Sequence, residues 1–133
     1  MNKYLSVIFL VSSLFSQIDY NTQIQPIFNN NCISCHVNGG GYAGLLDLSS
    51  YSETMEGGNS GNAVMPLEHS NSLLYNRITL PESNQQFMPK LGTALSQSDI
   101  DLIAQWIDEG ALEIPEDVDC YAADSTEGVE IWG

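Results

Sequence analysis

The sequence predicts an all-α fold built from four to five short helices. Four apolar residues between positions 100 and 107 recur at i, i+3, i+4 and i+7, which is the spacing of one helix face. Glycine-rich stretches at 37–44 and 57–62 lack this periodicity and are expected to be loops between the other helical segments. The first helical segment runs directly into a C-x-x-C-H motif at residues 32–36.

A first helix is expected over residues 20–31. Asn21 or Thr22 can cap its start. Pro26 is tolerated only in the first turn, because proline lacks the N–H group that later turns need. The apolar face of this helix consists of Ile24, Ile27 and Phe28.

Two shorter helices are expected in the middle of the chain. Residues 49–55 begin with serines that can act as an N-cap, and Glu53 follows in the first turn. Residues 69–78 place Leu74 and Ile78 one helical turn apart, so both side chains lie on one face.

The last helix has the clearest pattern. Residues 96–99 resemble a capping box in which Asp99 replaces the more usual glutamate, and Gly110 supplies a stop. Its apolar stripe cannot be buried alone, so we expect it to pack against the apolar face of the first helix. Trp106 lies beside the stripe and is expected in the core rather than at the edge of a cofactor.

The C-x-x-C-H motif predicts covalent attachment of a c-type haem. The thiols of Cys32 and Cys35 would add to the two vinyl groups of the porphyrin, which one turn of backbone can span. His36 would then lie under the iron as the proximal ligand. A redox-active cysteine pair or half of a zinc site is the alternative, but the adjoining histidine and the lack of a second cysteine pair disfavour both.

Residues 1–16 have the pattern of a secretory signal peptide, with Lys3 followed by an apolar stretch and a small residue. The run is short and rich in serine for a membrane span, although an uncleaved anchor is the alternative. No other stretch is expected to cross a bilayer. Because c-type haem is attached outside the cytoplasm, we expect an exported protein, either periplasmic or extracellular.

Acidic residues dominate the charge balance. Three Lys and Arg residues stand against seventeen Asp and Glu residues, so the formal net charge is −14. Loss of Lys3 would leave Arg77 and Lys90 as the remaining lysine and arginine residues. Such a surface repels nucleic acid and would favour a basic redox partner, or is simply a solvated acidic surface. Arg77 is expected to pair with a haem propionate or to make a surface ion pair.

The chain changes character after residue 112, which makes residues 17–112 the expected domain. Residues 113–133 form a dense acidic run with little periodicity, which predicts a solvated tail or a linker. Cys120 lies in this run as an odd thiol in an exported chain. It predicts an intermolecular disulfide, or a partner cysteine beyond Gly133 in a longer protein.

Together these segments resemble the small monohaem c-type cytochromes related to class I cytochrome c. The resemblance covers about residues 20–112. It implies a few helices wrapped around one covalently attached haem, with the first and last helices crossing. It also implies that His36 and Met88 are the two axial ligands of the iron. The matching residues are 24–28, the C-x-x-C-H motif, 44–48, 72–78, the Met88-Pro89 pair and 95–111.

Met88 lies in a loop just before the last helix, where the resembling family places its distal ligand. The following Pro89 stiffens the backbone, which suits a loop that holds one side chain in place. Met55, Met65 and His69 are the competing candidates, and an iron without a distal ligand is a further alternative. For any single methionine, ordinary core packing also remains an alternative.

With both axial positions filled, the resemblance implies single-electron transfer rather than catalysis. The sequence offers no nucleophile–base pair and no second haem motif that would point to an enzyme. One alternative is the haem domain or subunit of a larger exported oxidoreductase. Another is a structural or adhesion module that keeps the haem fold as a scaffold.

Overall fold

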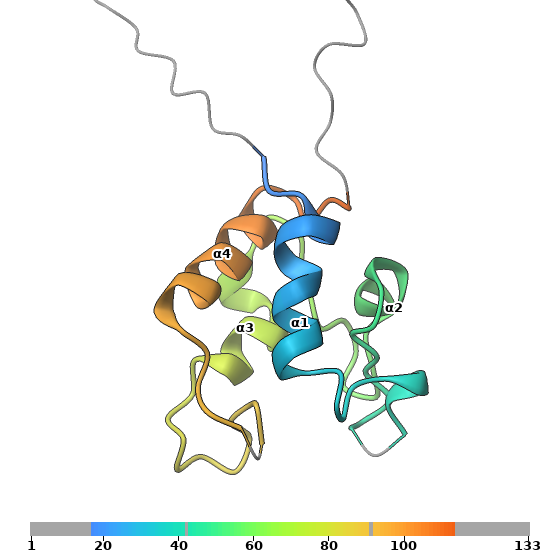
Figure 1. The fold of residues 1–133 in the computed structure, drawn as a ribbon, viewed down its shortest axis with the longest axis vertical. Helices are drawn as coiled ribbons and strands as arrows, with labels where there is room; N and C mark the ends of the chain where they lie inside the picture. The colour runs from blue at the N-terminus through green and yellow to red at the C-terminus, as the bar shows by residue number, and fades with distance from the viewer. Residues whose placement is uncertain (1–16, 42, 91, 114–133) are drawn as a thin grey trace, which may run out of the picture.

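The computed structural model describes residues 17–41, 43–90 and 92–113. No β-strand forms within these ranges, so the predicted all-α class is confirmed. The expected signal peptide, Cys120 and all of the expected tail except Glu113 lie outside the described residues. In chain order the elements are the π-helical turn η1 (Tyr20–Ile24), α1 (Gln25–Asn31), the 3-10 turn η2 (Asn38–Gly40), α2 (Tyr51–Glu56), the 3-10 turn η3 (His69–Asn71), α3 (Leu73–Ile78) and α4 (Gln97–Asp108) (Figure 1).

The column formed by η1 and α1 lies at the centre of the fold, with α3 and α4 on one side and α2 on the other (Figure 1). The two ends of the described chain lie together, where the Tyr20 N–H donates to the Glu113 carbonyl at 3.1 Å. The described residues of 32–50, which follow α1, and of 79–95, which follow α3, form two lobes at the opposite end (Figure 1). No helix among the described residues has the length and apolar character needed to cross a membrane.

The first helix begins differently from the prediction. The cap is Asp19, whose carboxylate accepts from the Thr22 N–H at 2.9 Å, and neither Asn21 nor Thr22 serves. Asp19 can do this because its own backbone is extended, which is the usual N-cap conformation. The chain then makes a π-helical turn before the α-helix. Pro26 therefore lies in the first turn of α1, as predicted.

The serine caps predicted for α2 and α4 are confirmed. The Ser50 hydroxyl accepts from the Glu53 N–H at 3.3 Å at the start of α2. The Ser96 hydroxyl accepts from the Asp99 N–H at 3.2 Å at the start of α4. Gly110 has a φ of 109° just after α4, a conformation that glycine adopts without strain.

The predicted helix over 69–78 is divided into η3 and α3. The division falls at Ser72, whose backbone is extended with a ψ of 122°. Ser72 is fully buried, and its hydroxyl accepts from the Met65 N–H at 2.8 Å. This contact holds the preceding loop against α3, so a buried polar anchor replaces a helical turn.

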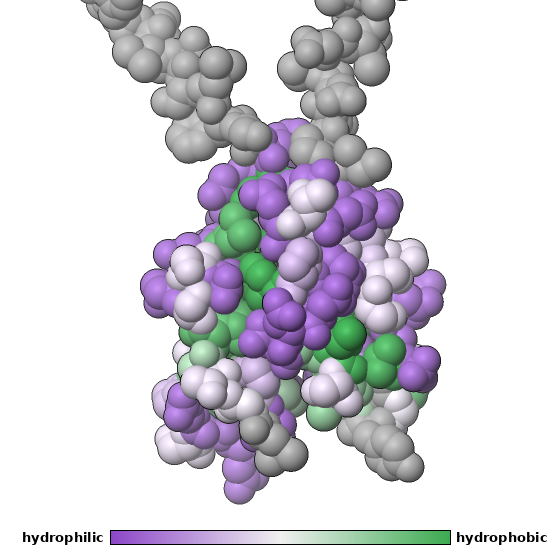
Figure 2. Space-filling model, viewed as in Figure 1, coloured by the Kyte–Doolittle hydropathy of each residue, from purple (hydrophilic) through white to green (hydrophobic). Residues whose placement is uncertain are grey.

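The hydrophobic core lies between η1, α1 and α4, as the two apolar faces predicted. Trp106 is 1% exposed and belongs to this core, which confirms its expected place. Polar side chains cover much of the outer face over α1, and apolar side chains show between α1 and α4 (Figure 2). The largest fully buried side chains are Trp106, Tyr20, Phe28, Ile24, Ile103, Ile107, Thr54 and Ser72.

Tyr20 is the aromatic centre of the core. Its ring lies 5.2 Å from that of Tyr51 and 5.3 Å from that of Trp106, measured between centroids. Its hydroxyl shares a 2.9 Å hydrogen bond with the Thr54 hydroxyl. Helices α2 and α4 are thereby both packed against η1 through one side chain.

We expect Tyr20 to make the stability of the protein sensitive to alkaline pH. Burial raises the pKa of Tyr20 from 10.0 to about 12, against the opposing effect of the Thr54 hydrogen bond. The folded state therefore keeps the phenol proton that the unfolded chain releases. The contribution of the Tyr20 phenol to the free energy of unfolding is complete below about pH 10 and declines by about 2–3 kcal/mol as the pH rises to about 12. Urea unfolding should show that the free energy of unfolding of Tyr20→Phe falls less than that of the wild type over this pH range. An equal decrease in the two proteins would contradict the assignment to Tyr20.

Candidate cofactor site

A cavity of about 930 Å³ opens between the two lobes. This volume lies within the range of roughly 300–1,000 Å³ that is typical of ligand-binding pockets. Figure 2 shows the notch between the lobes on one face of the molecule. The walls come from the end of α1, the C-x-x-C-H motif, both lobes and α3. Apolar side chains that line it include Phe28, Leu46, Leu48, Leu74, Ile78 and Leu95.

The C-x-x-C-H motif forms a tight turn directly after α1. The Cys35 and His36 N–H groups both donate to the Cys32 carbonyl, at 3.1 and 3.0 Å. The Cys32 N–H itself donates to the Phe28 carbonyl at 2.8 Å, which ties the turn to the helix end. Cys32, Cys35 and His36 all line the cavity, so the turn presents the whole motif to one space. Both thiols are free.

The Cys32 thiol has the character of an apolar side chain. Burial raises its pKa to about 11, because removal from water disfavours the thiolate. A redox-active pair or a zinc site needs a readily formed thiolate, and a raised pKa opposes this. Within the described ranges, no three His, Cys, Asp and Glu side chains group so as to hold a metal ion. The two alternatives to haem attachment therefore gain no support from this site.

His36 is oriented by the first lobe. Its ring Nδ1 lies 3.1 Å from the Leu46 carbonyl oxygen. A carbonyl oxygen can only accept, so Nδ1 carries the proton and Nε2 keeps its lone pair for a metal. The His36 main chain is also held, because its carbonyl accepts from the Leu48 N–H at 2.9 Å.

Met88 reaches the same cavity from the second lobe. Its side chain is half-buried. Its N–H donates to the Arg77 carbonyl at 3.1 Å, which ties the loop to the last turn of α3. The cavity therefore has an imidazole among its lining groups from one lobe and a thioether from the other.

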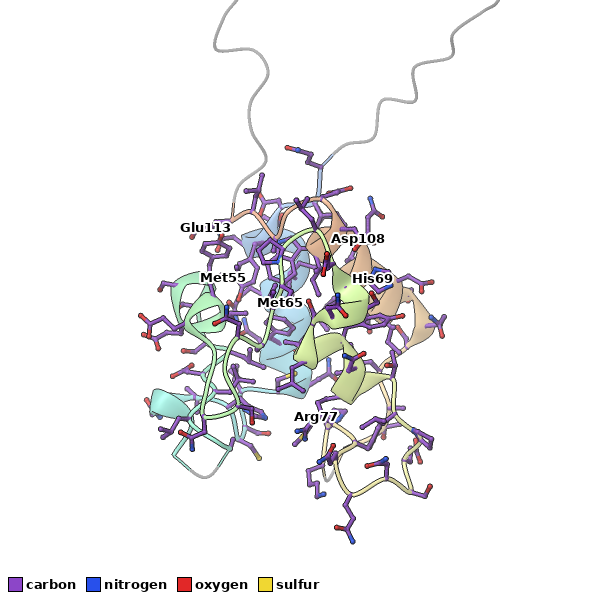
Figure 3. The ribbon with its side chains drawn as sticks, turned by 180° about the vertical axis from the view of Figure 1, so that it is seen from behind. Met55, Met65, His69, Arg77, Asp108 and Glu113 are labelled. Atoms are coloured by element: carbon purple, nitrogen blue, oxygen red, sulfur yellow. The ribbon has the colours of Figure 1, made fainter. Side chains whose placement is uncertain are left out.

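The competing ligand candidates lie elsewhere. Neither Met55 nor Met65 lines the cavity: Met55 packs against the core, and Met65 is 40% exposed. His69 also lies outside it and pairs with Asp108, with Nδ1 and Oδ2 separated by 2.7 Å (Figure 3). The hydrogen bond from the His69 backbone N–H, with the ring beside it, lowers the pKa of Asp108.

The residues that line the cavity carry positive charge, whereas the chain as a whole is strongly acidic. No Asp or Glu is among the lining residues, whereas Arg77 and Lys90 both are. Arg77 makes no ion pair within the described part of the chain, so the surface ion pair is not found; its guanidinium contacts the Gln86 carbonyl at 3.5 Å (Figure 3). The Lys90 ammonium donates to the Gln85 carbonyl. The sequence analysis did not predict that Lys90 lines the cofactor cavity. The signal for this role was that the chain has only three lysine and arginine residues, so any cation near a haem propionate had to come from this small set.

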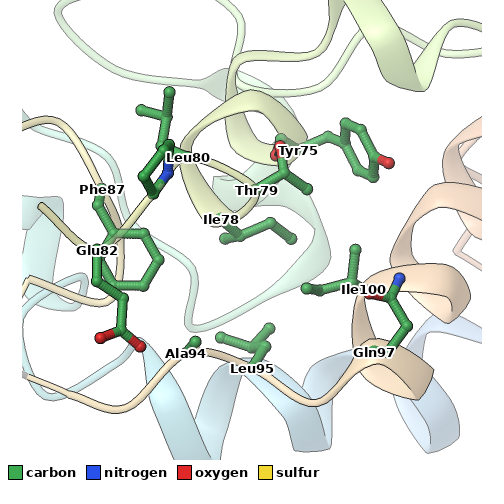
Figure 4. Close-up of a pocket in the computed structure, with 11 residues that line it drawn as sticks. Tyr75, Ile78, Thr79, Leu80, Glu82, Phe87, Ala94, Leu95, Gln97 and Ile100 are labelled. Atoms are coloured by element: carbon green, nitrogen blue, oxygen red, sulfur yellow. The ribbon is translucent and has the colours of Figure 1, made fainter. Parts of the chain in front are cut away.

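A second hollow, of about 470 Å³, lies between α3, the loop that follows it and the start of α4 (Figure 4). It shares Ile78, Ala94 and Leu95 with the larger cavity. These three residues therefore form part of a common wall. Phe87 and Glu82 line this hollow but not the larger cavity.

An all-α fold in which a C-x-x-C-H turn lines an apolar cavity defines a c-type cytochrome domain. Residues 32–92 match the family described as Planctomycete cytochrome C, which is a c-type cytochrome family. The matched segment begins at Cys32 and extends past Met88. This family implies haem-based electron transfer, and the spacing of Cys32 and Cys35 fits covalent attachment of a haem. No curated protein and no solved structure matched the chain in the same comparisons.

Proposed function

We propose that the protein is a single-electron carrier with one haem c. Cys32 and Cys35 would hold the haem through thioether bonds, with His36 as the proximal ligand and Met88 as the distal ligand. The supporting observation is that these four residues, from both lobes, line one apolar cavity. A bound haem supplies an iron that changes its oxidation state by one electron, and His/Met ligation raises its potential.

The other lining residues suit the same group. Apolar walls exclude water and match the body of the porphyrin. Arg77 and Lys90 provide positive charge for the two propionates, in a cavity wall free of carboxylates. If Arg77 or Lys90 alone were removed, the other cation would still neutralise part of the negative charge of the propionates.

We infer a carrier rather than an enzyme because Met88 would fill the position at which a substrate could bind iron. The proposal includes export by a signal peptide at residues 1–16, to the periplasm or the extracellular space. It assigns the haem to residues 17–112 and treats 113–133 as an acidic tail or linker. The net charge of −14 favours a basic redox partner, which could also be a catalytic subunit.

Covalent attachment can be tested on the purified protein. After denaturation, the intact mass should equal that of the processed chain plus one haem. Acid–organic extraction should leave the haem on the chain, because thioether bonds survive it. A Cys32→Ala/Cys35→Ala double variant should lose its haem in the same extraction. Release of haem from the wild type would contradict thioether attachment.

A further inference from the structure

We propose that Asp47 is a positioning residue that holds the Leu46 carbonyl against the His36 ring and thereby tunes the proximal ligand. This inference rests on the proposed role of His36 as an iron ligand. Asp47 does not line the cavity, whereas its neighbours Leu46 and Leu48 do. Asp47 would therefore affect His36 indirectly, by fixing the backbone of Leu46 and Leu48.

The Asp47 carboxylate joins the two ends of the loop that follows the motif. Oδ2 accepts from the Gly39 N–H at 2.7 Å. Oδ1 accepts from the Ser49 N–H at 2.9 Å and from the Ser49 hydroxyl at 2.6 Å. Gly39 and Ser49 are thus fixed to one side chain, which holds the backbone of residues 46–48 beside His36.

Asp47 also lies between the two residues that hold His36. On one side, the Leu46 carbonyl accepts from the imidazole Nδ1 at 3.1 Å. On the other side, the Leu48 N–H donates to the His36 carbonyl at 2.9 Å. Displacing Asp47 would move both contacts, so the ring and the main chain of His36 depend on the same anchor.

The Leu46 carbonyl is confined from a second direction. The preceding turn carries Gly44 and Leu45 with φ values of 69° and 59°, and a leucine in this region is strained. Loop 57–61 presses on this turn, and the Asn59 N–H donates to the Gly44 carbonyl at 2.7 Å. A Cβ on Gly58 would lie 2.7 Å from the Gly44 carbonyl oxygen, which leaves no room for a side chain. A strained turn held this closely indicates that its geometry matters to the site.

Charge gives Asp47 a second effect on the same site. It is 5% exposed and is the one buried carboxylate among the described residues. The hydrogen bonds from the Ser49 hydroxyl and from the Gly39 and Ser49 backbone N–H groups lower the pKa of Asp47, so the carboxylate stays ionised. A buried anion near the haem favours ferric over ferrous iron. A firm hydrogen bond at Nδ1 acts in the same direction, because it makes the imidazole more basic.

The test compares Asp47→Asn with Ser49→Ala in the haem-loaded protein. The Asp47→Asn side chain would lack the charge and the second acceptor oxygen, whereas Ser49→Ala keeps the charge and removes one hydrogen bond to Asp47. The first readout is hydrogen–deuterium exchange of the His36 Nδ1 proton, followed by NMR in the ferrous state. The second is the midpoint potential. Glu56→Gln, an exposed site on α2, controls for the loss of one negative charge.

For Asp47→Asn we expect exchange to be faster by roughly tenfold, as for a lost charged hydrogen bond. The reduction equilibrium should shift at least about threefold toward ferrous iron, which is about 28 mV at 59 mV per tenfold change. Ser49→Ala should give faster exchange than the wild type, and Glu56→Gln should change neither readout. If Asp47→Asn fails to assemble, Ser49→Ala alone decides the positioning role.

Unchanged exchange in Ser49→Ala, or in an assembled Asp47→Asn, would overturn the positioning role, even if the potential of Asp47→Asn shifts through charge alone. The proposed function fails separately. In that case the wild type itself would lack a thioether-bound haem or a histidine-ligated iron, before either variant is considered.

Discussion

Replacing Met88 with alanine should leave the haem attached and open the sixth position of the iron. The weak far-red band of ferric iron bonded to sulfur should be present in the wild type and absent from Met88→Ala. A thioether stabilises ferrous iron, so the midpoint potential should fall, on the order of 0.1 V within the roughly 0.8 V that axial ligands span. Carbon monoxide should then bind readily, because no protein ligand competes for the site.

Two other methionines provide matched controls for this experiment. Met65→Ala removes an exposed side chain outside the cavity and should leave both the band and the potential unchanged. Met55→Ala removes a side chain that packs against the core, so it should lower stability but keep the band. If Met65→Ala loses the band while Met88→Ala keeps it, the distal ligand is Met65. A native spectrum of bis-histidine iron would instead require His69 to leave Asp108.

The parts of the fold that follow from local chemistry were predictable. Helical spacing and serine caps located α2 and α4, and two apolar faces that each needed a partner indicated how α4 packs. The start of the first helix was not predictable in this way. Asp19 caps a π-helical turn that places Tyr20 in the core, and no helical period in the sequence signals a π turn. The break at Ser72 depends on a tertiary hydrogen bond to Met65, which a local pattern does not contain.

The candidate site divides in the same manner. The motif residues are adjacent in sequence, and their chemistry is specific, so Cys32, Cys35 and His36 could be assigned from the sequence. Met88 needed a family resemblance, because a methionine is more often a core residue than a ligand. Asp47 could not be found from the sequence at all. Its role depends on hydrogen bonds that bring Gly39 and Ser49 together and on the path of the backbone beside His36.

Truncation of Trp106 should cause the largest loss of stability in the core. Its side chain is 1% exposed, its ring lies 5.3 Å from that of Tyr20, and its indole N–H donates to the Leu112 carbonyl at 2.8 Å. Trp106→Ala removes these contacts and leaves a cavity between α4 and η1. We expect a cost of about 3–5 kcal/mol, a large part of the roughly 5–15 kcal/mol by which domains are usually stable. Urea unfolding of the haem-loaded protein, followed by circular dichroism, measures it.

The haem environment should survive the same change, because Trp106 does not line the cavity. In the absence of urea, Trp106→Ala should keep the far-red band, whereas Met88→Ala loses it with a smaller change in stability. Trp106→Phe keeps one aromatic ring but loses the N–H donor and part of the buried indole volume, so its cost should lie below that of Trp106→Ala, at about 2–3 kcal/mol. Gln105→Ala, on the exposed side of α4, should cost no more than about 0.5 kcal/mol. If Trp106→Ala cost as little as Gln105→Ala, α4 would not depend on this side chain, and the core contact with Tyr20 would not determine the stability of the fold.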